Sequence, residues 1–392
     1  MFQRDGNTAF KKDLTNIVKL CEALGKPHEK FKSIHIAGTN GKGSTSHILS
    51  AALQVEGYKV GLYTSPHLKD FRERIRLNGK CVSEEYVVSF VEQIQPYIKT
   101  INPSFFEITV AMAFNYFAQE NVDIAIIETG LGGRLDSTNI ITPILSIITN
   151  IGLDHTEMLG ETLEEIAAEK AGIIKKGVPV VIGEANDACL AVFEEKAKKE
   201  NAPLINAWMR PMTMEYNPTD LKGAYQYKNI NLSKIVVGEL NNIGLALNIN
   251  SWREGIQDVK GITGLRGKWD TLQEENPKII CDTGHNKEGL EMVVESLKQE
   301  QYEHLHFVLG VVKEKNLDLL NILPKDAHYY FCKPNIPRGM DSKTLTIEAT
   351  KRGFRGHDCI TVKEALLLAK ANAGNNDLIF IGGSTFVVAE VE

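Results

Sequence analysis

The chain has 392 residues, 43% of them hydrophobic and 24% charged, with a formal net charge of −6. A chain of this length is longer than one domain with a single hydrophobic core usually is, so we expect two domains. The negative net charge argues against a general nucleic-acid-binding protein. The sequence has no apolar run long enough to span a membrane, no signal-peptide-like N-terminus and no C-x-x-C pair among six scattered cysteines, so we expect no membrane association and a reducing, cytoplasmic location.

Short apolar stretches alternate with amphipathic ones through the first half of the chain. An amphipathic helix is expected over residues 14–24, before Gly25 and Pro27. The segment FRERIRLNGK, with its Asn-Gly turn signal, predicts a hairpin. Further strands are expected at 34–37, 58–63, 122–128, 144–149 and 178–182, and further helices at 46–56, 83–98, 105–119, 162–174 and 187–199. This alternation predicts a doubly wound α/β sheet with helices on both faces.

The second half contains a less regular segment and then another α/β block. Residues 203–235 are expected to be less regular, with helical character returning between 237 and 258. Glycines crowd the stretch ITGLRGKWD, and we place the domain link there, giving domains of residues 1–260 and 261–392. Strands are then expected at 278–281, 305–309, 329–332 and 377–381, and helices at 288–298, 344–352 and 362–371. We predict a P-loop-type ATPase domain followed by a smaller Rossmann-like domain.

The stretch SIHIAGTNGKGST is typical of a phosphate-binding loop. A short apolar strand leads into a glycine-rich turn and a helix start, where backbone N–H groups and the helix N-terminus attract phosphate. Lys42 would supply charge for the terminal phosphates, and Ser44 or Thr45 a hydroxyl near the metal. In the usual P-loop Ser or Thr follows the lysine directly, whereas here Gly43 intervenes. The alternative is a tight strand-to-helix turn with an exposed lysine.

Polar residues at strand ends are candidate metal ligands, because ligands bind at the carboxyl ends of strands in such sheets. Glu128 ends an apolar strand and suits Mg²⁺, unless it only caps the next loop. His155 follows Asp154, which can fix its tautomer for a second divalent ion, although a structural role is equally open. Ser65, in TSPHL, either offers a hydroxyl to the first metal or is a turn residue.

Lys170 and the segment ICDTGHN carry further candidates. Lys170 has apolar helix neighbours, which would lower its pKa and let it react with carbon dioxide to give a carbamate; the alternative is a solvated lysine. Asp282 can hold a ribose hydroxyl, and His285 and Asn286 can line the base or phosphate side. Asn286 can equally serve as a helix N-cap.

A series of motifs extends over most of the chain and together resembles one family. They are HIAGTNGKGST, YTSPHL with FRERI, FFEIT, IIETGLGGRLDSTN, LDHTEMLG, EKAGIIK, LKGAYQYKN, CDTGHN, RGKWD, Pro337-Arg338-Gly339 and IGGSTFVVAEV. In this order they resemble the folylpolyglutamate synthase/dihydrofolate synthase family of the Mur ligase superfamily. In that family a glycine after the loop lysine is expected, so Gly43 supports the resemblance.

The resemblance implies a role for each matching residue. The ATP phosphates would be bound by Thr39, Asn40, Gly41, Lys42, Gly43 and Ser44, and ATP would also be contacted by Asn229, Asp282 and His285. One Mg²⁺ would be held by Ser65 and Glu128 and a second by Glu128 and His155, with a carbamylated Lys170 supporting the site. Pterin substrates would be bound by Ser104, Phe106, Leu135, Asp136 and Ser137.

The sequence departs from the family pattern at two places. Where the family often has Gly-Arg, this chain has Gly267-Lys268 with Arg266 just before, so either basic residue can meet the phosphates. Lysine keeps the charge but lacks the bidentate fork of arginine. The segment FKKDLTN, residues 10–16, differs from the glycine-containing pattern usual in the family, which bears on part of the pterin pocket.

The reaction implied is ATP-dependent amide ligation in folate biosynthesis and one-carbon metabolism. A carboxylate, from dihydropteroate, from a folate γ-carboxylate or from both, would become an acyl phosphate, and L-glutamate would attack it. Lys42 and two Mg²⁺ would offset the charge. We expect a monomer acting on small molecules, including polyglutamylation of folates.

Three other functions remain open from the sequence. A muramyl-peptide ligase would usually carry a further N-terminal domain, for which a loop starting near residue 38 leaves no room. A nucleotide-binding regulatory module would not need Glu128, His155 and Lys170. A P-loop motor would need an oligomer interface and an arginine finger.

Overall fold

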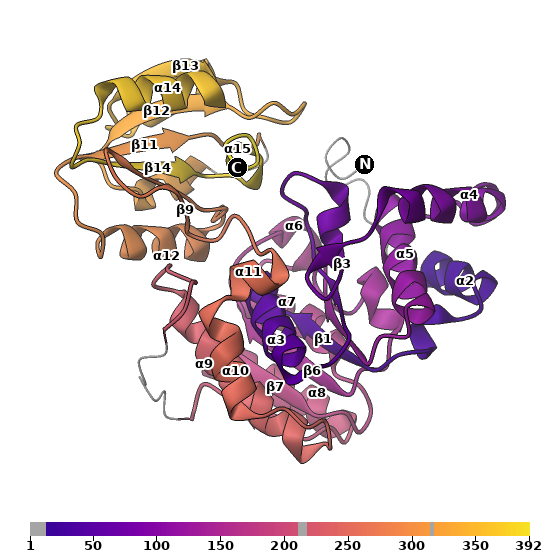
Figure 1. Cartoon of the computed structure of the whole chain (residues 1–392). Coiled ribbons are helices and arrows are strands. Elements are labelled where there is room, and N and C mark those ends of the chain that lie inside the picture. Colours follow the sequence, from indigo (N-terminus) through magenta and orange to yellow (C-terminus); the bar gives the residue numbers. More distant parts are fainter. Residues whose placement is uncertain (1–12, 211–217, 314–316) are drawn as a thin grey trace. The chain divides into compact units, whose positions relative to one another are not determined.

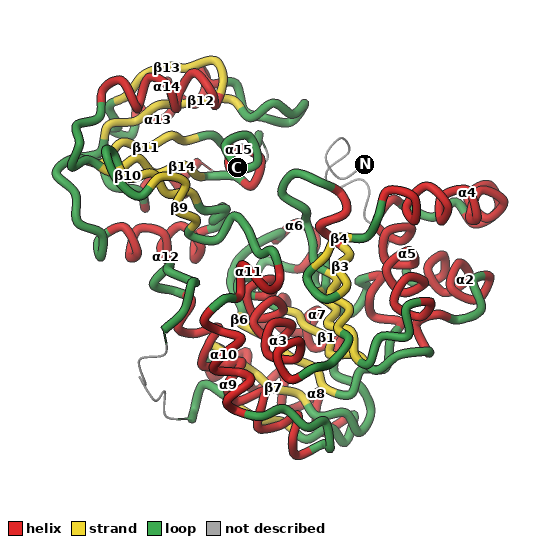
Figure 2. The backbone as a smooth tube through the Cα atoms, in the orientation of Figure 1, coloured by secondary structure: helices red, strands yellow, loops and turns green. Residues whose placement is uncertain are grey.

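The computed structural model describes residues 13–210, 218–313 and 317–392, so residues 10–12 of the divergent N-terminal segment lie outside it. The chain divides into two compact units, each described here by itself. The N-terminal unit contains the described residues up to Asp220 together with Gln226–Leu265. The C-terminal unit contains Leu221–Tyr225 and Arg266–Glu392. Figure 1 shows the elements along the chain, and Figure 2 separates helices from strands.

The N-terminal unit is built on an eight-stranded sheet of order β4-β3-β2-β5-β1-β6-β7-β8. Its strands are β1 (Ser33–Ala37), β2 (Val60–Tyr63), β3 (Ile75–Leu77), β4 (Lys80–Cys81), β5 (Ile124–Glu128), β6 (Leu145–Asn150), β7 (Val180–Glu184) and β8 (Leu204–Asn206). Strands β3 and β4 form the antiparallel hairpin predicted around Asn78-Gly79, and the other six strands are parallel. The carboxyl ends of β1, β2, β5 and β6 therefore meet at one edge.

Helices cover both faces of this sheet, which confirms the doubly wound prediction. They are α2 (Thr15–Ala23), α3 (Lys42–Glu56), α4 (Glu84–Ile101), α5 (Phe105–Gln119), α6 (Thr156–Leu159), α7 (Leu163–Lys170), α8 (Asp187–Lys199), α9 (Gln226–Asn242), α10 (Ile249–Gln257) and α11 (Val259–Thr263). Helices α3, α9 and α10 lie side by side (Figure 1). Phe114 of α5 and Phe193 of α8 belong to buried clusters that include strand residues such as Ile127 and Ile182.

The C-terminal unit contains a six-stranded sheet of order β13-β12-β11-β14-β10-β9, parallel except for β9. Its strands are β9 (Asp270–Gln273), β10 (Lys278–Cys281), β11 (Leu305–Leu309), β12 (His328–Lys333), β13 (Gly356–Thr361) and β14 (Leu378–Gly382). Its helices are α12 (Lys287–Leu297), α13 (Ser342–Lys351), α14 (Val362–Asn372) and α15 (Thr385–Val388). Trp269, Phe307 and Phe380 lie in its core.

One sequence prediction is wrong in part. Residues 203–235 were expected to be less regular, but α9 begins at Gln226 and includes their last third. The buried face of this helix carries Gln226, Asn229 and Ser233 beside its apolar residues. Because several buried positions are polar, the apolar periodicity that identifies a helix is weak there. No helix within the described residues is long and apolar enough to cross a membrane.

Candidate active site

The phosphate-binding loop follows β1 and leads directly into α3. Gly41 has a φ of +82°, and a Cβ there would collide with the carboxamide of Asn229. The N–H of Asn40 donates to Asn150 Oδ1 at 2.7 Å, and the N–H of Thr39 donates to the Asn150 carbonyl at 3.0 Å. The loop is therefore fixed to the carboxyl end of β6, and its first turn needs glycine.

Lys42 begins α3 and folds back over the loop. Its Nζ donates to the carbonyl oxygens of Gly38 and Thr39 at 3.0 and 3.2 Å. These are the same carbonyls that precede the glycine turn, so the ammonium lies close to the concavity formed by the loop. A charge held there, beside the N-terminus of a fifteen-residue helix, suits an anionic ligand.

Glu128 and the TSPHL loop lie beside this turn. Glu128 ends β5 with 4% of its surface exposed, and its Oε2 accepts the N–H of Ser65 at 3.1 Å. A Cβ built at Gly43 would lie 3.8 Å from the same Oε2. Thus three strand ends bring a carboxylate, a serine and the phosphate loop together. Buried carboxylate and hydroxyl oxygens are the hard ligands that Mg²⁺ prefers, so the residues present fit this ion.

His155 lies in the loop after β6. Its backbone N–H donates to Asp154 Oδ1 at 3.0 Å, and its Nε2 lies 4.0 Å from Asp154 Oδ2, with a left-handed φ of +52°. The hydroxyl of Thr39 donates to the Gly152 carbonyl at 3.1 Å, which ties this loop to the phosphate loop. The chain three residues before His155 is therefore tied to the phosphate loop, and His155 itself is exposed with a carboxylate beside it, as expected of a metal-ligating histidine.

Lys170 also contacts the phosphate loop. It is 3% exposed at the end of α7, and its Nζ donates to the Gly38 carbonyl at 3.0 Å. Burial, and then the positive charge of Lys42, lower the pKa of Lys170 to about 7, although Asp154 and Asp136 oppose this shift. A large fraction of Lys170 is therefore a neutral, nucleophilic amine near neutral pH.

Asn229 lies on α9, whose start the sequence did not reveal. It is buried against Gly41, and its Nδ2 donates to Gln226 Oε1 at 2.9 Å. The carboxamide thus contacts the phosphate loop although 188 residues separate the two in sequence. Asn229 and Lys170 approach the loop from different elements, α9 and α7.

The residues predicted for the pterin lie at the start of α5 and after β5. Ser104 caps α5 by accepting the N–H of Glu107 at 3.2 Å, and the Phe106 ring packs against Gly130. Asp136 is buried and accepts the N–H groups of Leu131 and Thr138 at 2.8 and 3.0 Å. Burial raises the pKa of Asp136, and these hydrogen bonds oppose the shift. Asp136 therefore shapes the loop that contains Leu135 and Ser137.

In the C-terminal unit, Asp282 follows β10 and lies at the centre of a hydrogen-bond network. Its carboxylate accepts the Tyr225 hydroxyl at 2.5 Å, the Trp269 N–H at 2.8 Å and the Gly284 N–H at 2.7 Å. Burial raises the pKa of Asp282, whereas Lys268 and the hydrogen bonds lower it. The role of Tyr225 was missed, because nothing in LKGAYQYKN distinguishes it from its neighbouring tyrosine.

The two basic residues of RGKWD have different partners. Lys268 Nζ donates to the Thr283 hydroxyl at 2.7 Å, while Arg266 pairs with Glu392 at 3.3 Å. His285 Nδ1 lies 2.9 Å from the Thr283 carbonyl. Asn286 caps α12 through the N–H of Gly289 at 2.8 Å. Lys268 therefore lies with Asp282 and His285 at the end of β10.

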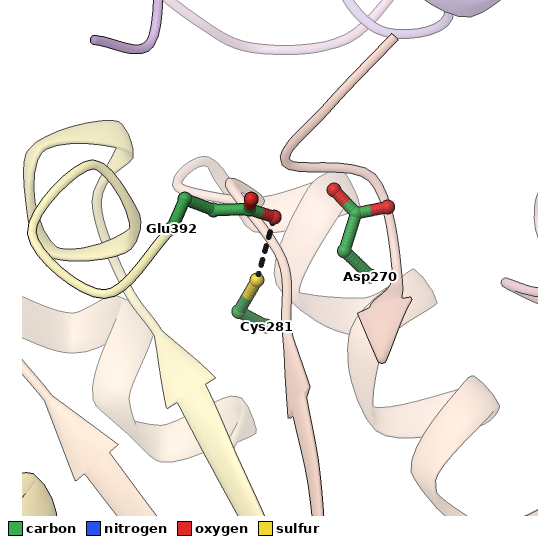
Figure 3. Close-up of side chains that lie close together, drawn as sticks. All are labelled: Asp270, Cys281 and Glu392. Atoms are coloured by element: carbon green, nitrogen blue, oxygen red, sulfur yellow. Dashed lines mark hydrogen bonds between the residues drawn. The ribbon is translucent and has the colours of Figure 1, made fainter. Parts of the chain in front are cut away.

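A cluster of two carboxyl groups and a thiol, from Asp270, Glu392 and Cys281, lies in the same unit (Figure 3). The Cys281 thiol donates to Glu392 Oε1 at 3.6 Å, and Asp270 lies beside them and accepts the Gly267 N–H. Burial and the adjacent Asp270 raise the pKa of Glu392, and burial raises the pKa of the Cys281 thiol. The Glu392 carboxyl and the Cys281 thiol therefore favour their protonated forms, and no sequence pattern indicated that the three side chains would lie together.

Comparisons with known proteins agree along the chain. The Mur ligase middle domain matches residues 36–247, and the Mur ligase glutamate ligase domain matches residues 268–385. A Bacillus subtilis dihydrofolate synthase/folylpolyglutamate synthase is 33% identical over 411 residues, covering 97% of this chain and 94% of the relative.

Two solved structures are similar over nearly all of the chain. Escherichia coli FolC in complex with DHPP and ADP has a TM-score of 0.89 at 27% identity, covering 100% of this chain and 95% of that one. A bifunctional folylpolyglutamate synthase/dihydrofolate synthase with Mn, AMPPNP and L-glutamate bound has a TM-score of 0.85 at 29% identity, covering 97% and 94%.

Proposed function

The chain belongs to the dihydrofolate synthase/folylpolyglutamate synthase family of Mur ligases, and on that premise we propose that it is an ATP-dependent ligase for L-glutamate. Its acyl donor is dihydropteroate, the γ-carboxylate of a folate, or both. The observation that carries this proposal is the meeting of the phosphate loop, Glu128 and Lys170 at one sheet edge. The relative solved with Mn, AMPPNP and L-glutamate bound supports ATP and L-glutamate as two of the substrates.

The reaction needs two steps, because a carboxylate has no good leaving group. First, a carboxylate oxygen of the donor bonds to the γ-phosphorus of ATP and the bond to ADP breaks, which gives an acyl phosphate. The amine of L-glutamate then bonds to the acyl carbon, phosphate leaves and the nitrogen loses a proton. Lys42 and the N–H groups at the start of α3 stabilise the phosphoryl charge in the first step.

Residues around the loop have distinct proposed roles. Thr39, Asn40, Gly41, Gly43 and Ser44 bind the phosphates with Lys42. Ser65 and Glu128 would hold one Mg²⁺, and Glu128 and His155 a second; the ions would supply positive charge between the phosphates. Asn229 and, from the C-terminal unit, Asp282, His285 and Lys268 contact ATP. Ser104, Phe106, Leu135, Asp136 and Ser137 bind the pterin.

Lys170 is proposed to act as a carbamate. Its neutral amine bonds to the carbon of carbon dioxide and releases one proton, so that a neutral group becomes an anion next to Lys42. The buried position and lowered pKa of Lys170 support this change.

The two parts of the chain have different proposed roles. Residues 1–260 would bind ATP and folate, and residues 261–392 would form the glutamate ligase domain. One chain supplies every proposed contact, so a monomer suffices, and neither a membrane nor a nucleic acid is needed.

The decisive assay supplies ATP, Mg²⁺ and L-glutamate with either dihydropteroate or tetrahydrofolate, and identifies products by mass. Phosphate release should require both the pterin acid and L-glutamate. Lys42→Ala and Glu128→Ala should each abolish ligation and leave the circular dichroism spectrum unchanged. Lys69→Ala, which changes an exposed lysine, should retain ligation. Turnover with neither substrate, or only with a UDP-linked muramyl peptide, would refute the proposal.

A further inference from the structure

A buried arginine beside the candidate site has no acidic partner. Arg74 lies at the end of the 3₁₀ turn Phe71–Arg74 and is 7% exposed. Its Nε donates to His67 Nδ1 at 2.8 Å, and its guanidinium carbon lies 5.8 Å from the centroid of the Phe105 ring. Within residues 13–210, 218–313 and 317–392, no Asp or Glu side chain forms an ion pair with it. A buried cation without an anion is costly to keep.

Within the described residues, the side chain that accepts a hydrogen bond from Arg74 is that of His67. Because His67 Nδ1 accepts the Nε–H of Arg74, that ring nitrogen carries no proton and the imidazole does not cancel the charge of the guanidinium. Other arginines in this unit differ. Arg72 pairs with Asp70 at 2.6 Å, and the buried Arg76 donates through both Nη atoms to the carbonyls of Gly79 and Gly264. The burial of Arg74 is therefore not explained by the kind of ion pair or paired carbonyl contacts that Arg72 and Arg76 make.

A second buried donor lies at the same place. Tyr63 ends β2 and is fully buried, and in the part of the chain that the structure describes its hydroxyl proton has no hydrogen-bond acceptor. Tyr63 pairs with Ile75 in the sheet, and the N–H of Thr64 donates to the Arg74 carbonyl at 3.1 Å, so Tyr63 and Arg74 occupy neighbouring positions on adjacent segments. The guanidinium interacts with the phenol. Two donors, one of them cationic, thus lie together, and within the described residues no carboxylate forms a hydrogen bond or ion pair with either of them.

The surroundings of this pair indicate which anion fits. Tyr63 pairs with Ile127 in the sheet, so it is adjacent to Glu128 and two residues before Ser65. On the other side, its ring centroid lies 6.4 Å from that of Phe106, and Arg74 packs on Phe105. The pair therefore lies between the proposed metal ligands and an aromatic surface. A carboxylate attached to an aromatic group matches both sides.

We propose that Arg74 and Tyr63 bind the carboxylate of the acyl donor and hold it beside the phosphate loop, an inference that rests on the proposed function. The guanidinium and the phenol donate to the carboxylate oxygens and offset its charge as it approaches ATP. L-Glutamate also carries carboxylates, but the aromatic side chains at this position favour the pterin-bearing substrate. Both residues contact substrate and act in binding and positioning.

The test compares Arg74→Gln with the matched variant Arg72→Gln, in which a partly exposed arginine of the same turn is changed. KM is measured for dihydropteroate, ATP and L-glutamate, together with the melting temperature with and without dihydropteroate. Arg74→Gln should raise KM for dihydropteroate about 10- to 100-fold, as expected for hydrogen bonds to a charged group, and leave KM for ATP and L-glutamate unchanged. Tyr63→Phe should act in the same direction by about 3- to 10-fold, and Arg72→Gln should have no effect.

If Arg74 had only a structural role, its substitution would not change the preference of the protein for a charged ligand over a neutral one. The wild-type protein should bind dihydropteroate more tightly than its carboxamide analogue, and Arg74→Gln should lose this preference. Without ligand, Arg74→Gln should melt no lower than the wild type, since no acidic partner is lost. A lower melting temperature with unchanged KM, or a rise in KM for L-glutamate alone, would overturn the inference. If Arg74→Gln does not fold, Tyr63→Phe with unchanged KM overturns it. Absence of ligation by the wild type refutes the proposed function instead.

Discussion

Lys170 and Lys42 donate to the same carbonyl oxygen, that of Gly38, each at 3.0 Å. Their Nζ atoms are thus no more than about 6 Å apart, where two positive charges would repel by about 3 kcal/mol at an effective dielectric constant of ~20. Burial is the larger cause, and burial and this repulsion together lower the pKa of Lys170 from 10.5 to about 7. This difference corresponds to roughly 5 kcal/mol of unfavourable free energy for the charged form.

The sign of the resulting pH dependence follows from proton counts. Between pH 7 and 10.5 the unfolded chain keeps the Lys170 proton and the folded chain does not, so the free energy of unfolding rises with pH in this window. Below pH 7 the penalty is fully present. Lys170→Met removes the group at similar length, and its stability should lack this slope. The variant should therefore exceed the wild type most at pH 6 to 7, with the difference shrinking by up to about 1.4 kcal/mol per pH unit above that.

The assay is urea denaturation of both proteins from pH 6 to 9, in degassed buffer and again with bicarbonate. Carbon dioxide should stabilise the wild type by trapping the neutral amine as a carbamate, with a carbamate signal in the ¹³C NMR spectrum from labelled bicarbonate. Neither effect should occur in Lys170→Met, and exposed Lys176→Met should behave as the wild type. In ligation assays, Lys170→Ala should be inactive and partly restored by formate or acetate. If the free energy of unfolding changed with pH in the same way in the wild type and in Lys170→Met, or if the wild type did not respond to bicarbonate, this reasoning would be refuted.

Two further substitutions test the loop and the C-terminal network. Gly41→Ala should destabilise the protein by about 1 to 3 kcal/mol and raise KM for ATP, because its φ is +82° and a Cβ would collide with Asn229. Gly43→Ala, next along the loop after Lys42, meets only ordinary contacts and should keep its melting temperature; equal losses in both variants would contradict the argument. Tyr225→Phe should lower the stability of the C-terminal unit by about 1 to 3 kcal/mol, since it removes a donor from buried Asp282. Calorimetry that finds no change would contradict this role.

The sequence predicted elements well where one face is clearly apolar. Helix α5 has the predicted bounds, and β1 and β5 lie within a few residues of theirs, because apolar runs closed by glycine or polar residues specify them. The start of α9 was missed for the opposite reason. Its buried face carries Asn229, which contacts the phosphate loop, and Gln226, so polar contacts replace the apolar pattern on which the prediction depends.

The expectation that ligands bind at strand ends predicted only part of the candidate site. It placed Glu128 at the edge where the phosphate loop lies, since parallel strands share their carboxyl ends. It gave no information on contacts that depend on which strands are neighbours. Tyr63 and Arg74 approach each other because β2 pairs with both β5 and β3, and Asp282 meets Tyr225 across 57 residues. Such pairings arise from the sheet order, which local sequence does not encode.

The unusual spacing of the phosphate loop has a physical explanation in this sheet order. Strand β5 is the neighbour of β1, so its terminal Glu128 faces the first turn of α3. A Cβ at residue 43 would lie 3.8 Å from Glu128 Oε2, and a side chain longer than alanine would have to displace the carboxylate. Gly43 therefore keeps Glu128 close to the loop, and the hydroxyl usual after a P-loop lysine moves one position on, to Ser44. On this reasoning Gly43→Val should lose ligation while Gly43→Ala retains it, because only the larger side chain reaches the carboxylate.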